Sequence, residues 1–338
     1  MASSLGVMII GAGRVSTAHA RAVAETPGAK LVAIADVDRG RADAFAQKHG
    51  GQALADYAEG LKRDDIHIVT IALPHHLHER ATVDAVSAGK HVFIEKPMAD
   101  TVEECDRMIA AAEKAGVQLF VAHTQRYFAS TIRARELLHD GSLGRPVFAT
   151  DTWYKPFGIE TRPPWMLDRA TGGGMWLMDG AHQIDRTCWV MGSDVESVKA
   201  YIDSPFHGTK ADDAELALLQ LRNGQYASII HTGYAKRGVD KCEVEVACTN
   251  GMLKFDSYSN WLQVDKDGQY VPVDVPRHDP FTLEMRNLVG AIEGKERLGV
   301  SPAWGRHIVE VLNACEQSSR TGREVRIQSH GIEVPVAR

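Results

Sequence analysis

Short apolar runs separated by helix-compatible segments fill the first third of the chain. Five of these runs have the length and composition of buried parallel strands: residues 7–10, 31–35, 66–73, 91–94 and 117–121. Helical patterns lie between several of them, for example over 79–89 and 102–115. This alternation predicts an α/β fold whose N-terminal part is a Rossmann-type, doubly wound parallel sheet.

The pattern changes near residue 122, where strand-like runs begin to follow one another. After a helix at about 130–139, these runs cover residues 146–154, 195–202, 214–221, 225–233, 241–248 and 252–256. Asn223-Gly224 and Asn250-Gly251 are hairpin signals between such runs. We therefore expect a first domain over 1–122 and a C-terminal α/β domain over 123–338 with a large, mainly antiparallel open sheet. A helix at about 302–319 is expected to pack back on the first domain.

Helices are expected on one face of the second sheet only, so its other face needs a cover. A wide apolar face and an exposed sheet edge favour association. We therefore expect a homo-oligomer, a dimer or a tetramer, to form through this open face.

The first apolar run leads into the glycine-rich segment 11–16, which reads Gly-Ala-Gly-Arg-Val-Ser. Gly11 allows a tight turn, Gly13 lets the backbone approach a pyrophosphate, and the start of the following helix offers free N–H groups to its charge. Ser16 stands where a third glycine is usual, and it is small enough for close packing. The segment indicates a dinucleotide fingerprint.

Asp36 ends the second apolar run, 20 residues after Ser16. A carboxylate at this spacing bonds the ribose hydroxyls of the adenosine and repels a 2′-phosphate, which favours NAD over NADP. Arg39 and Arg41 follow closely and can weaken this preference, so NADP stays possible.

Glu95-Lys96-Pro97 ends the apolar run 91–94. A lysine held among apolar groups beside a positively charged oxidised nicotinamide should have its pKa lowered by desolvation and by the like charge. Lys96 could then share a hydroxyl proton near neutral pH. Taken alone, the motif favours a solvated charge pair at a strand end, and the neighbouring motifs change this interpretation.

Three histidines follow the run 66–73, within Pro74-His75-His76-Leu77-His78. No HExxH spacing, nearby cysteine or carboxylate set completes a metal site, so we expect none. At the carboxyl end of a parallel strand these residues are expected to line the cofactor crevice.

Several motifs together resemble the GFO/IDH/MocA oxidoreductase family. Residues 71–78 and 88–98 are similar to its core signature, the segment 172–182 with its three glycines and His182 to its second-domain helix, and 321–325 to its closing strand. The resemblance implies a dehydrogenase that transfers hydride to NAD, built from a Rossmann domain and a domain with a large open sheet.

The resemblance also implies the catalytic groups. Lys96 would polarise the reacting hydroxyl and His182 would accept its proton, with the substrate between the domains. The family has an aspartate four residues before the histidine, whereas this chain has Met178 there. Asp179, three residues before His182, and Asp185, three residues after it, are the two candidates for its carboxylate partner.

The segment 162–185 resembles the phthalate dihydrodiol dehydrogenase-like branch, whose members oxidise ring-bound vicinal hydroxyls. Arg162 could pair with a substrate carboxylate, although a surface arginine fits the sequence equally well. Aromatic residues could stack on a substrate ring or pack in a core. The expected substrate contacts are Lys96, Arg126, Tyr154, Arg162, Trp165, Trp176, Asp179 and His182. The expected cofactor contacts are Gly11, Ala12, Gly13, Arg14, Val15, Asp36, Arg41, Leu73, Pro74, His75, His78, Glu95, Lys96 and Gln125.

The composition limits the classes of partner that we expect the protein to bind. The net charge of −6 gives no basic surface for nucleic acid or acidic membranes. No stretch has signal-peptide character or the length to span a bilayer, and the five cysteines have no pairing or metal spacing, which suits reduced thiols in the cytoplasm. We expect a small cyclic, polyol-like substrate.

The predicted reaction is hydride transfer between nicotinamide and a secondary alcohol of a sugar, cyclitol or glycoside. Three alternatives stay open: a cis-dihydrodiol dehydrogenase of an aromatic acid, an NAD-dependent glycosidase without net redox change, and a non-catalytic regulator that senses the dinucleotide. The presence of both Lys96 and His182 argues against the regulator.

Overall fold

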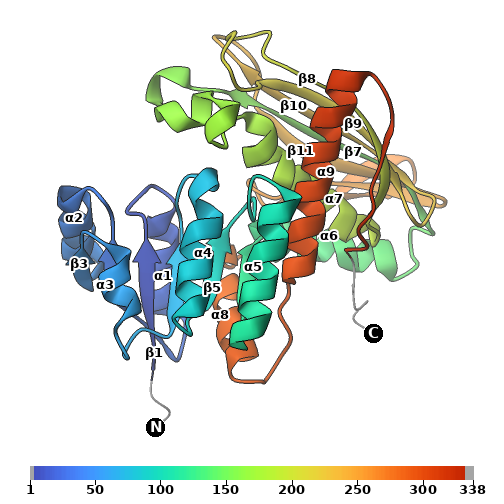
Figure 1. Ribbon diagram of the computed structural model, residues 1–338. Helices are drawn as coiled ribbons and strands as arrows, with labels where there is room; N and C mark the ends of the chain where they lie inside the picture. The colour runs from blue at the N-terminus through green and yellow to red at the C-terminus, as the bar shows by residue number, and fades with distance from the viewer. Residues whose placement is uncertain (1–3, 332–338) are drawn as a thin grey trace. The chain divides into compact units, whose positions relative to one another are not determined.

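The computed structural model describes residues 4–331, and the chain divides into two compact units. The first comprises Met1–His123 and Asp279–Arg306, and the second comprises Thr124–His278 and His307–Arg338. Each unit is built around its own sheet (Figure 1).

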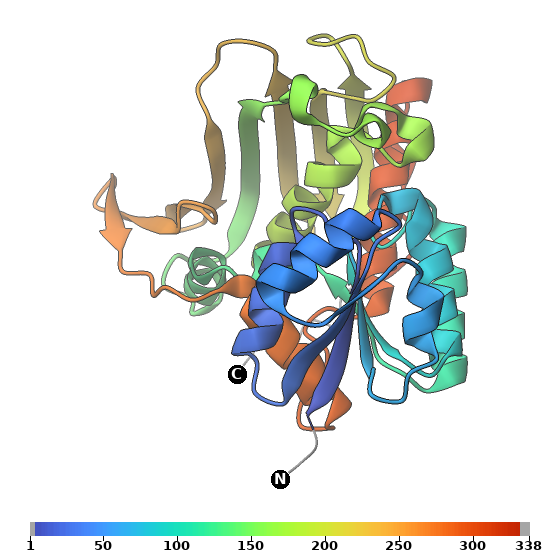
Figure 2. The same ribbon diagram turned by 90° about the vertical axis from the view of Figure 1, so that its left-hand side faces the viewer.

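The first unit contains a parallel sheet with the strand order β3-β2-β1-β4-β5-β6 (Figure 2). Its strands are β1 (Leu5–Ile10), β2 (Ala29–Ala35), β3 (Gln52–Leu54), β4 (Ile68–Ile71), β5 (His91–Glu95) and β6 (Leu119–Ala122). Its helices are α1 (Ser16–Glu25), α2 (Arg39–His49), α3 (Tyr57–Leu61), α4 (His78–Ser87), α5 (Val102–Ala115) and α8 (Pro280–Ile292), with a short 3₁₀ turn η1 (His75–Leu77). The order reverses at β1 and β4, and in such sheets ligands bind beyond the carboxyl ends of the strands at this point.

Local sequence sets the limits of these elements. Helix α5 begins with a capping box in which Thr101 and Glu104 bond each other's backbone N–H groups, and it ends at Gly116 in the left-handed conformation. Strands β4 and β5 are buried throughout except at His91, because helices cover both faces of a parallel sheet.

The second unit contains a sheet with the strand order β14-β13-β12-β11-β7-β10-β9-β8-β15, in which β7 and β10 are parallel and the other pairs antiparallel. Its strands are β7 (Pro146–Pro156), β8 (Val195–Asp203), β9 (Ala214–Leu221), β10 (Tyr226–Tyr234), β11 (Lys241–Cys248), β12 (Gly251–Asp256), β13 (Trp261–Lys266), β14 (Gln269–Val273) and β15 (Val325–Arg326). Helix α6 (Ala129–His139), the π-helical turn η6 (Trp176–Gly180) and α7 (Ala181–Met191) belong to this unit, and α9 (Pro302–Thr321) enters it from residue 307. The remaining 3₁₀ turns are η2 (Thr124–Tyr127), η3 (Ile159–Thr161), η4 (Pro164–Leu167) and η5 (Arg169–Thr171).

The two faces of this second sheet differ in polarity and exposure. Alternate residues of β7 and β9 are buried, and Asp151 of β7 bonds Gln183 and Arg186 of α7, so this helix covers the inner face. Large apolar side chains remain exposed on the opposite face: Phe148, Tyr201, Leu216, Leu218 and Tyr226. The predicted fold class is therefore confirmed, including the hairpins at Asn223-Gly224 and Asn250-Gly251.

Candidate functional site

The glycine-rich loop after β1 has the shape that a dinucleotide requires. Gly11 has a φ of 98°, and a Cβ on it would lie 2.3 Å from the carbonyl oxygen of Ala72, so only glycine fits. A Cβ on Gly13 would have no neighbour within 4 Å, which leaves open space at the loop. Ser16 is buried and donates its hydroxyl to the Gly11 carbonyl at 2.5 Å, which closes the turn.

Helix α1 follows this loop with its first N–H groups available. Its N-cap residue, Val15, makes no side-chain cap, and its first turn carries no acidic residue. Together with the open space at Gly13, these N–H groups fit the pyrophosphate of a dinucleotide.

Asp36, at the end of β2, is fixed against this loop. One carboxylate oxygen accepts from the N–H of Ala12 at 2.9 Å, and the other accepts from the N–H of Asp38 and from Nη2 of Arg41 at 3.0 Å. The Asp36 side chain is 8% exposed. Such a held carboxylate fits the recognition of two ribose hydroxyls.

Lys96 follows β5 and is half-buried, and its backbone is held by the preceding carboxylate. Glu95 accepts from the Lys96 N–H at 3.2 Å through one oxygen, and its other oxygen lies 2.8 Å from Nε2 of His19. Burial by itself would raise the pKa of Glu95, but the His19 hydrogen bond and the charges of His19 and Lys96 outweigh it and hold the pKa below its usual value. The Lys96–Pro97 peptide bond is cis.

His19 is a positioning residue that the sequence prediction missed. Its ring meets Phe93 and Phe281 edge-on, at centroid distances of 5.2 and 5.5 Å, which fixes the imidazole opposite Glu95. The available signal was its place on α1, three residues after Ser16 and on the same helix face.

His78 and Glu95 were predicted to contact the cofactor; both have hydrogen-bond partners within the protein, and their contact with the cofactor stays a prediction. His78 is fully buried, with its ring nitrogens 3.0 Å from the carbonyl oxygen of Pro97 and 2.9 Å from that of Leu73. Burial lowers its pKa. His78 therefore connects the segment after β4 with the segment after β5 through its two ring nitrogens. The carboxylate of Glu95 contacts the ring of His19 and the backbone N–H of Lys96.

In the second unit, acid–base side chains gather around the indole of Trp153. Nζ of Lys155 lies 4.3 Å from the centre of this ring, and the rings of His182 and His231 lie at centroid distances of 6.5 and 5.5 Å. Asp179 joins the group, since its Oδ2 is 2.5 Å from Nζ of Lys155 and 3.5 Å from Nε2 of His231. We call these five residues the Trp153 cluster.

The two carboxylates proposed as partners of His182 have different surroundings. Asp185 is completely buried and accepts from Nε of Arg126 at 2.7 Å, whereas Asp179 belongs to the Trp153 cluster. Arg126, predicted to contact substrate, is thus 8% exposed and paired inside the second unit. Lys155 was missed; its signal was the strand alternation that places it on the same face as Trp153.

Trp176, Tyr154 and Gln125 each have a defined place in the second unit, and their predicted contacts with substrate or cofactor stay predictions. Trp176 is fully buried and donates its indole N–H to the carbonyl of Leu312 at 3.1 Å. Tyr154 lies on the outer face of the sheet, because strand alternation points it away from the side of Trp153. Gln125 is 1% exposed, and its oxygen accepts from Ser257 at 2.6 Å.

Arg162 and Trp165 lie in the segment between β7 and α7. Nε of Arg162 donates to the carbonyl of Phe157 at 2.6 Å, and its guanidinium lies 4.8 Å from the centre of the Phe157 ring. Both Arg162 and Trp165 are half-buried, so their predicted contact with substrate stays a prediction.

A buried ion pair fastens α7 to β7. The guanidinium of Arg186 donates twice to Asp151, each time at 2.6 Å, and Thr187 donates to the same carboxylate at 3.0 Å. The pair therefore fixes the register of the helix that carries His182 against the strand that carries Trp153 and Lys155.

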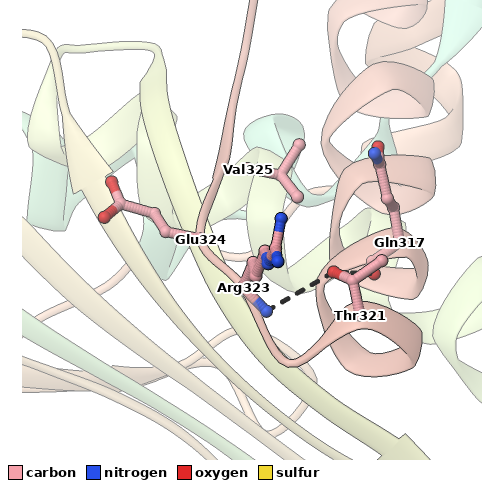
Figure 3. A pocket seen from close by; sticks show the side chains of 5 residues that line it. All are labelled: Gln317, Thr321, Arg323, Glu324 and Val325. Carbon is pink, nitrogen blue, oxygen red and sulfur yellow. Dashed lines mark hydrogen bonds between the residues drawn. The ribbon is translucent and has the colours of Figure 1, made fainter.

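Two of the hollows on the surface of the second unit are lined by residues outside the predicted site. One, of about 460 Å³, lies between the end of α9 and β15 and is lined by Gln317, Thr321, Arg323, Glu324 and Val325 (Figure 3). The other, of about 260 Å³, has Asp212 in its lining.

Within residues 4–331, no group of three or more His, Cys, Asp or Glu side chains is arranged to hold a metal ion. No helix in this part of the chain has the length and apolar character needed to cross a membrane.

Comparison with known proteins decides the family. A model described as an oxidoreductase family with an NAD-binding Rossmann fold matches residues 5–123, and a GFO/IDH/MocA C-terminal domain model matches residues 131–254. The chain belongs to the GFO/IDH/MocA oxidoreductase family. The predicted family, enzyme class and NAD cofactor are confirmed, and the glycine loop and Asp36 lie within the matched NAD-binding domain.

Relatives of this oxidoreductase include enzymes with cyclic substrates. A 1-carboxy-3-chloro-3,4-dihydroxycyclohexa-1,5-diene dehydrogenase of Comamonas testosteroni is 33% identical over 213 residues, which cover 63% of this chain and 54% of the relative. Inositol 2-dehydrogenase of Salmonella typhimurium is 25% identical over 93% of this chain and 94% of its own. The crystal structure of an aldose-aldose oxidoreductase from Caulobacter crescentus has a TM-score of 0.86 and 25% identity, covering 96% and 99% of the two chains.

Asp36→Ala should weaken NAD binding to this oxidoreductase about tenfold or more, because one or two charge-assisted hydrogen bonds to the ribose are lost. NADP should be weakened less or bind better, since Arg41 would be released from Asp36 and could pair with a 2′-phosphate. Fluorescence titration with NADH and NADPH measures both. Adding Arg41→Ala to Asp36→Ala should remove any increase in NADPH affinity. An unchanged NADH affinity in Asp36→Ala would contradict the role of Asp36 in binding the ribose.

Proposed function

We propose that this oxidoreductase is an NAD-dependent dehydrogenase of a secondary alcohol on a six-membered ring, such as a cyclitol, sugar or glycoside. The observation that carries the proposal is the Trp153 cluster, in which His182 and the Lys155–Asp179 pair surround an aromatic ring. An aromatic face suits a cyclic substrate, and the imidazole and carboxylate suit proton transfer. The inositol 2-dehydrogenase relative supports a cyclic alcohol as substrate.

The chain's own residues have the following proposed roles. Gly11, Gly13 and Asp36 would hold NAD, which when bound supplies the hydride acceptor. Lys96 polarises the reacting hydroxyl, and His182 accepts its proton as general base.

Around this histidine, the Lys155–Asp179 pair has a supporting role. The ammonium of Lys155 pairs with Asp179 and holds its carboxylate in place, so that the carboxylate can orient the imidazole of His182. Asp185 forms an ion pair with Arg126, and this pairing favours Asp179 as the partner of His182.

A second candidate is the oxidation of a cis-dihydrodiol of an aromatic acid. The dihydrodiene dehydrogenase relative, 33% identical, supports it. In this case Arg162 would pair with the ring carboxylate, for which a guanidinium fork is suited.

A screen for NADH formation tests both candidates. The protein would be incubated with NAD and with panels of cyclitols, aldoses, glycosides and aromatic cis-dihydrodiols. A preferred cyclitol or aldose supports the first candidate, and a preferred dihydrodiol supports the second. Repeated turnover of a glycoside without net NADH would support the glycosidase alternative instead, and no turnover in any panel would contradict the proposal.

We also propose that the open face of the second sheet is a subunit interface. Cross-strand neighbours on this face are large and apolar: Tyr201 lies opposite Leu216, and Phe148 opposite Tyr226, with exposed fractions between 38% and 62%. Such a surface favours burial against a second copy of the chain.

Sedimentation at micromolar concentration should therefore show a dimer or tetramer. Leu218→Glu, in the middle of this face, should shift the distribution toward smaller species, because a charge would be buried in an apolar interface. Val239→Glu, an exposed position between β10 and β11, is the matched control and should leave the distribution unchanged. A monomeric wild-type protein would contradict the interface.

A further inference from the structure

A line of buried titratable side chains extends from the Trp153 cluster through the second sheet. Nε2 of His231 faces Oδ2 of Asp179 at 3.5 Å, and Nδ1 of the same ring lies 2.8 Å from Oε2 of Glu215. The carboxyl group of Glu215 in turn lies within hydrogen-bond reach of that of Asp212. Four groups are thereby connected in the order Asp179, His231, Glu215, Asp212.

The strand register explains this alignment. His231 of β10 and Glu215 of β9 are directly opposite in an antiparallel pair, and both point to the inner face. Their exposed fractions are 0% and 3%, so neither group exchanges protons with water directly. Mutual hydrogen bonding alone does not account for these groups, because two carboxyls buried side by side repel each other when both are ionised.

Two carboxyls in such contact have to share a proton. With that proton on Glu215 and directed to Asp212, the Nδ1–H of His231 donates to the other oxygen of Glu215. The unprotonated Nε2 then faces Asp179, ready to accept a proton from it. Burial raises the pKa of Glu215 well above its usual value and lowers that of His231 to about 3, and both directions favour this protonation state near neutral pH.

The charged groups around the line keep this state stable. Besides Asp179, His231 is faced by Lys155, Arg186 and Arg162, whose positive charges oppose a second proton on the ring. The negative charges of Asp179, Asp212 and Asp213 act on Glu215 and favour its protonated form, and Glu316 acts in the same way on Asp212.

Asp212 is the member of this line of side chains that lies at the protein surface. It forms part of the lining of the hollow of about 260 Å³, together with Arg169 and Glu316. Its carboxylate is fixed, since one oxygen accepts from the N–H of Trp176 at 2.6 Å. Gly174, with a φ of 106°, lets the backbone approach so closely that a Cβ there would lie 2.1 Å from the other oxygen.

We propose that Asp179, His231, Glu215 and Asp212 form a proton relay that carries the alcohol proton from the Trp153 cluster to solvent in the hollow lined by Asp212. The inference rests on the proposed function, which supplies one proton for each alcohol oxidised. His231, Glu215 and Asp212 are positioning residues, because they act through Asp179 and do not touch substrate.

Each step moves one proton and no electrons. A proton received by Asp179, from the hydroxyl or through His182, passes to Nε2 of His231 while the Nδ1 proton passes to Glu215. The proton that Glu215 already held passes to Asp212, which releases it to water in the hollow. A turn of the His231 ring and of the Glu215 carboxyl resets the line, and the reduction direction uses the same steps in reverse.

The test uses Glu215→Gln and Asp212→Asn in the full-length protein, with the alcohol that the wild-type protein oxidises best in the NADH screen. Both substitutions keep the size and shape of the side chain but remove the carboxyl group that would transfer the proton. We expect kcat to fall about tenfold, whereas loss of a group that acts on the substrate itself lowers it about 100-fold or more. KM should stay nearly unchanged. The pH profile of kcat and the solvent isotope effect should both change. Imidazole added to an Asp212→Ala variant should restore part of the lost rate, because it can enter the space left by the side chain and accept the proton from Glu215.

His207→Gln is the matched control. His207 makes a similar contact, with Nδ1 2.9 Å from Oδ2 of Asp213, but it does not belong to the line from Asp179. This variant should keep the wild-type pH profile and isotope effect and gain nothing from imidazole. If either Glu215→Gln or Asp212→Asn fails to fold, the other still tests the relay.

An infrared measurement needs no substrate. The wild-type protein at neutral pH should show the carbonyl stretch of a protonated carboxylic acid, and Glu215→Gln should lack it. An ionised Glu215, or an active wild type whose two variants keep its rate, pH profile and isotope effect, would overturn the relay alone. A wild-type protein that forms no NADH with any panel would overturn the proposed function and, with it, the relay.

Discussion

Lys96→Ala is expected to lower turnover by about two orders of magnitude or more, while affinity for NAD falls much less. Lys96 stands directly after β5, and its backbone N–H is held by Glu95, which is held in turn by His19. These contacts fix the backbone from which the Lys96 side chain extends, and the proposed role of its ammonium is to polarise the reacting hydroxyl. The glycine loop and Asp36 bind the dinucleotide through other contacts, so the substitution should separate kcat from cofactor affinity.

The measurement combines NADH formation with NADH fluorescence titration. Lys90→Ala is the matched control, since Lys90 directly precedes the same strand and donates its ammonium to the carbonyl of Arg63 at 2.8 Å. It should lower stability without a comparable loss of kcat. Turnover at the wild-type level in Lys96→Ala would remove the residue from the proposed mechanism.

The tight turn at Gly11 and the strand that ends before Asp36 were predictable because their signals are local in sequence. Gly11 needs a positive φ and Asp36 ends a strand, and both requirements act within a few residues. His19 was missed, and the partners of His78 were not predicted, because both depend on residues far along the chain: Glu95 for His19, and the carbonyl of Pro97 for His78.

The second unit was less predictable because side-chain direction there depends on strand register. Tyr154 and Trp153 are equally aromatic, but alternation puts only Trp153 on the face covered by α7. The extents of β7 to β12 had a local signal, whereas the burial of Trp176 against Leu312 depends on a helix more than a hundred residues later.

Several elements also lacked a clear pattern. Strands β13 and β14 were missed because polar residues interrupt them and Pro272 lies within β14, a position that only an edge strand tolerates. Helix α8 was missed, and nothing local shows that Asp279–Arg306 belong to the first compact unit.

Arg186→Met should lower the free energy of unfolding of the second unit by about 3–5 kcal/mol. Arg186 is 1% exposed, and both of its hydrogen bonds to Asp151 are lost in the variant, which leaves a buried carboxylate without its counter-charge. Gln183 and Thr187 still donate to Asp151, but neutral donors compensate a buried charge only in part. Urea unfolding monitored by tryptophan fluorescence measures the change.

The companion variants separate the buried charge from lost packing. Asp151→Leu combined with Arg186→Met should be less destabilised than the sum of the two single variants, because no unpaired charge remains. Arg133→Met removes an exposed pair with Glu136 and should change stability by about 0.5 kcal/mol or less. Because the pair fixes α7 to β7, Arg186→Met should also lose turnover under conditions where it stays folded. An equal effect of the buried and exposed substitutions would show that this ion pair does not hold His182 in register with Trp153 and Lys155.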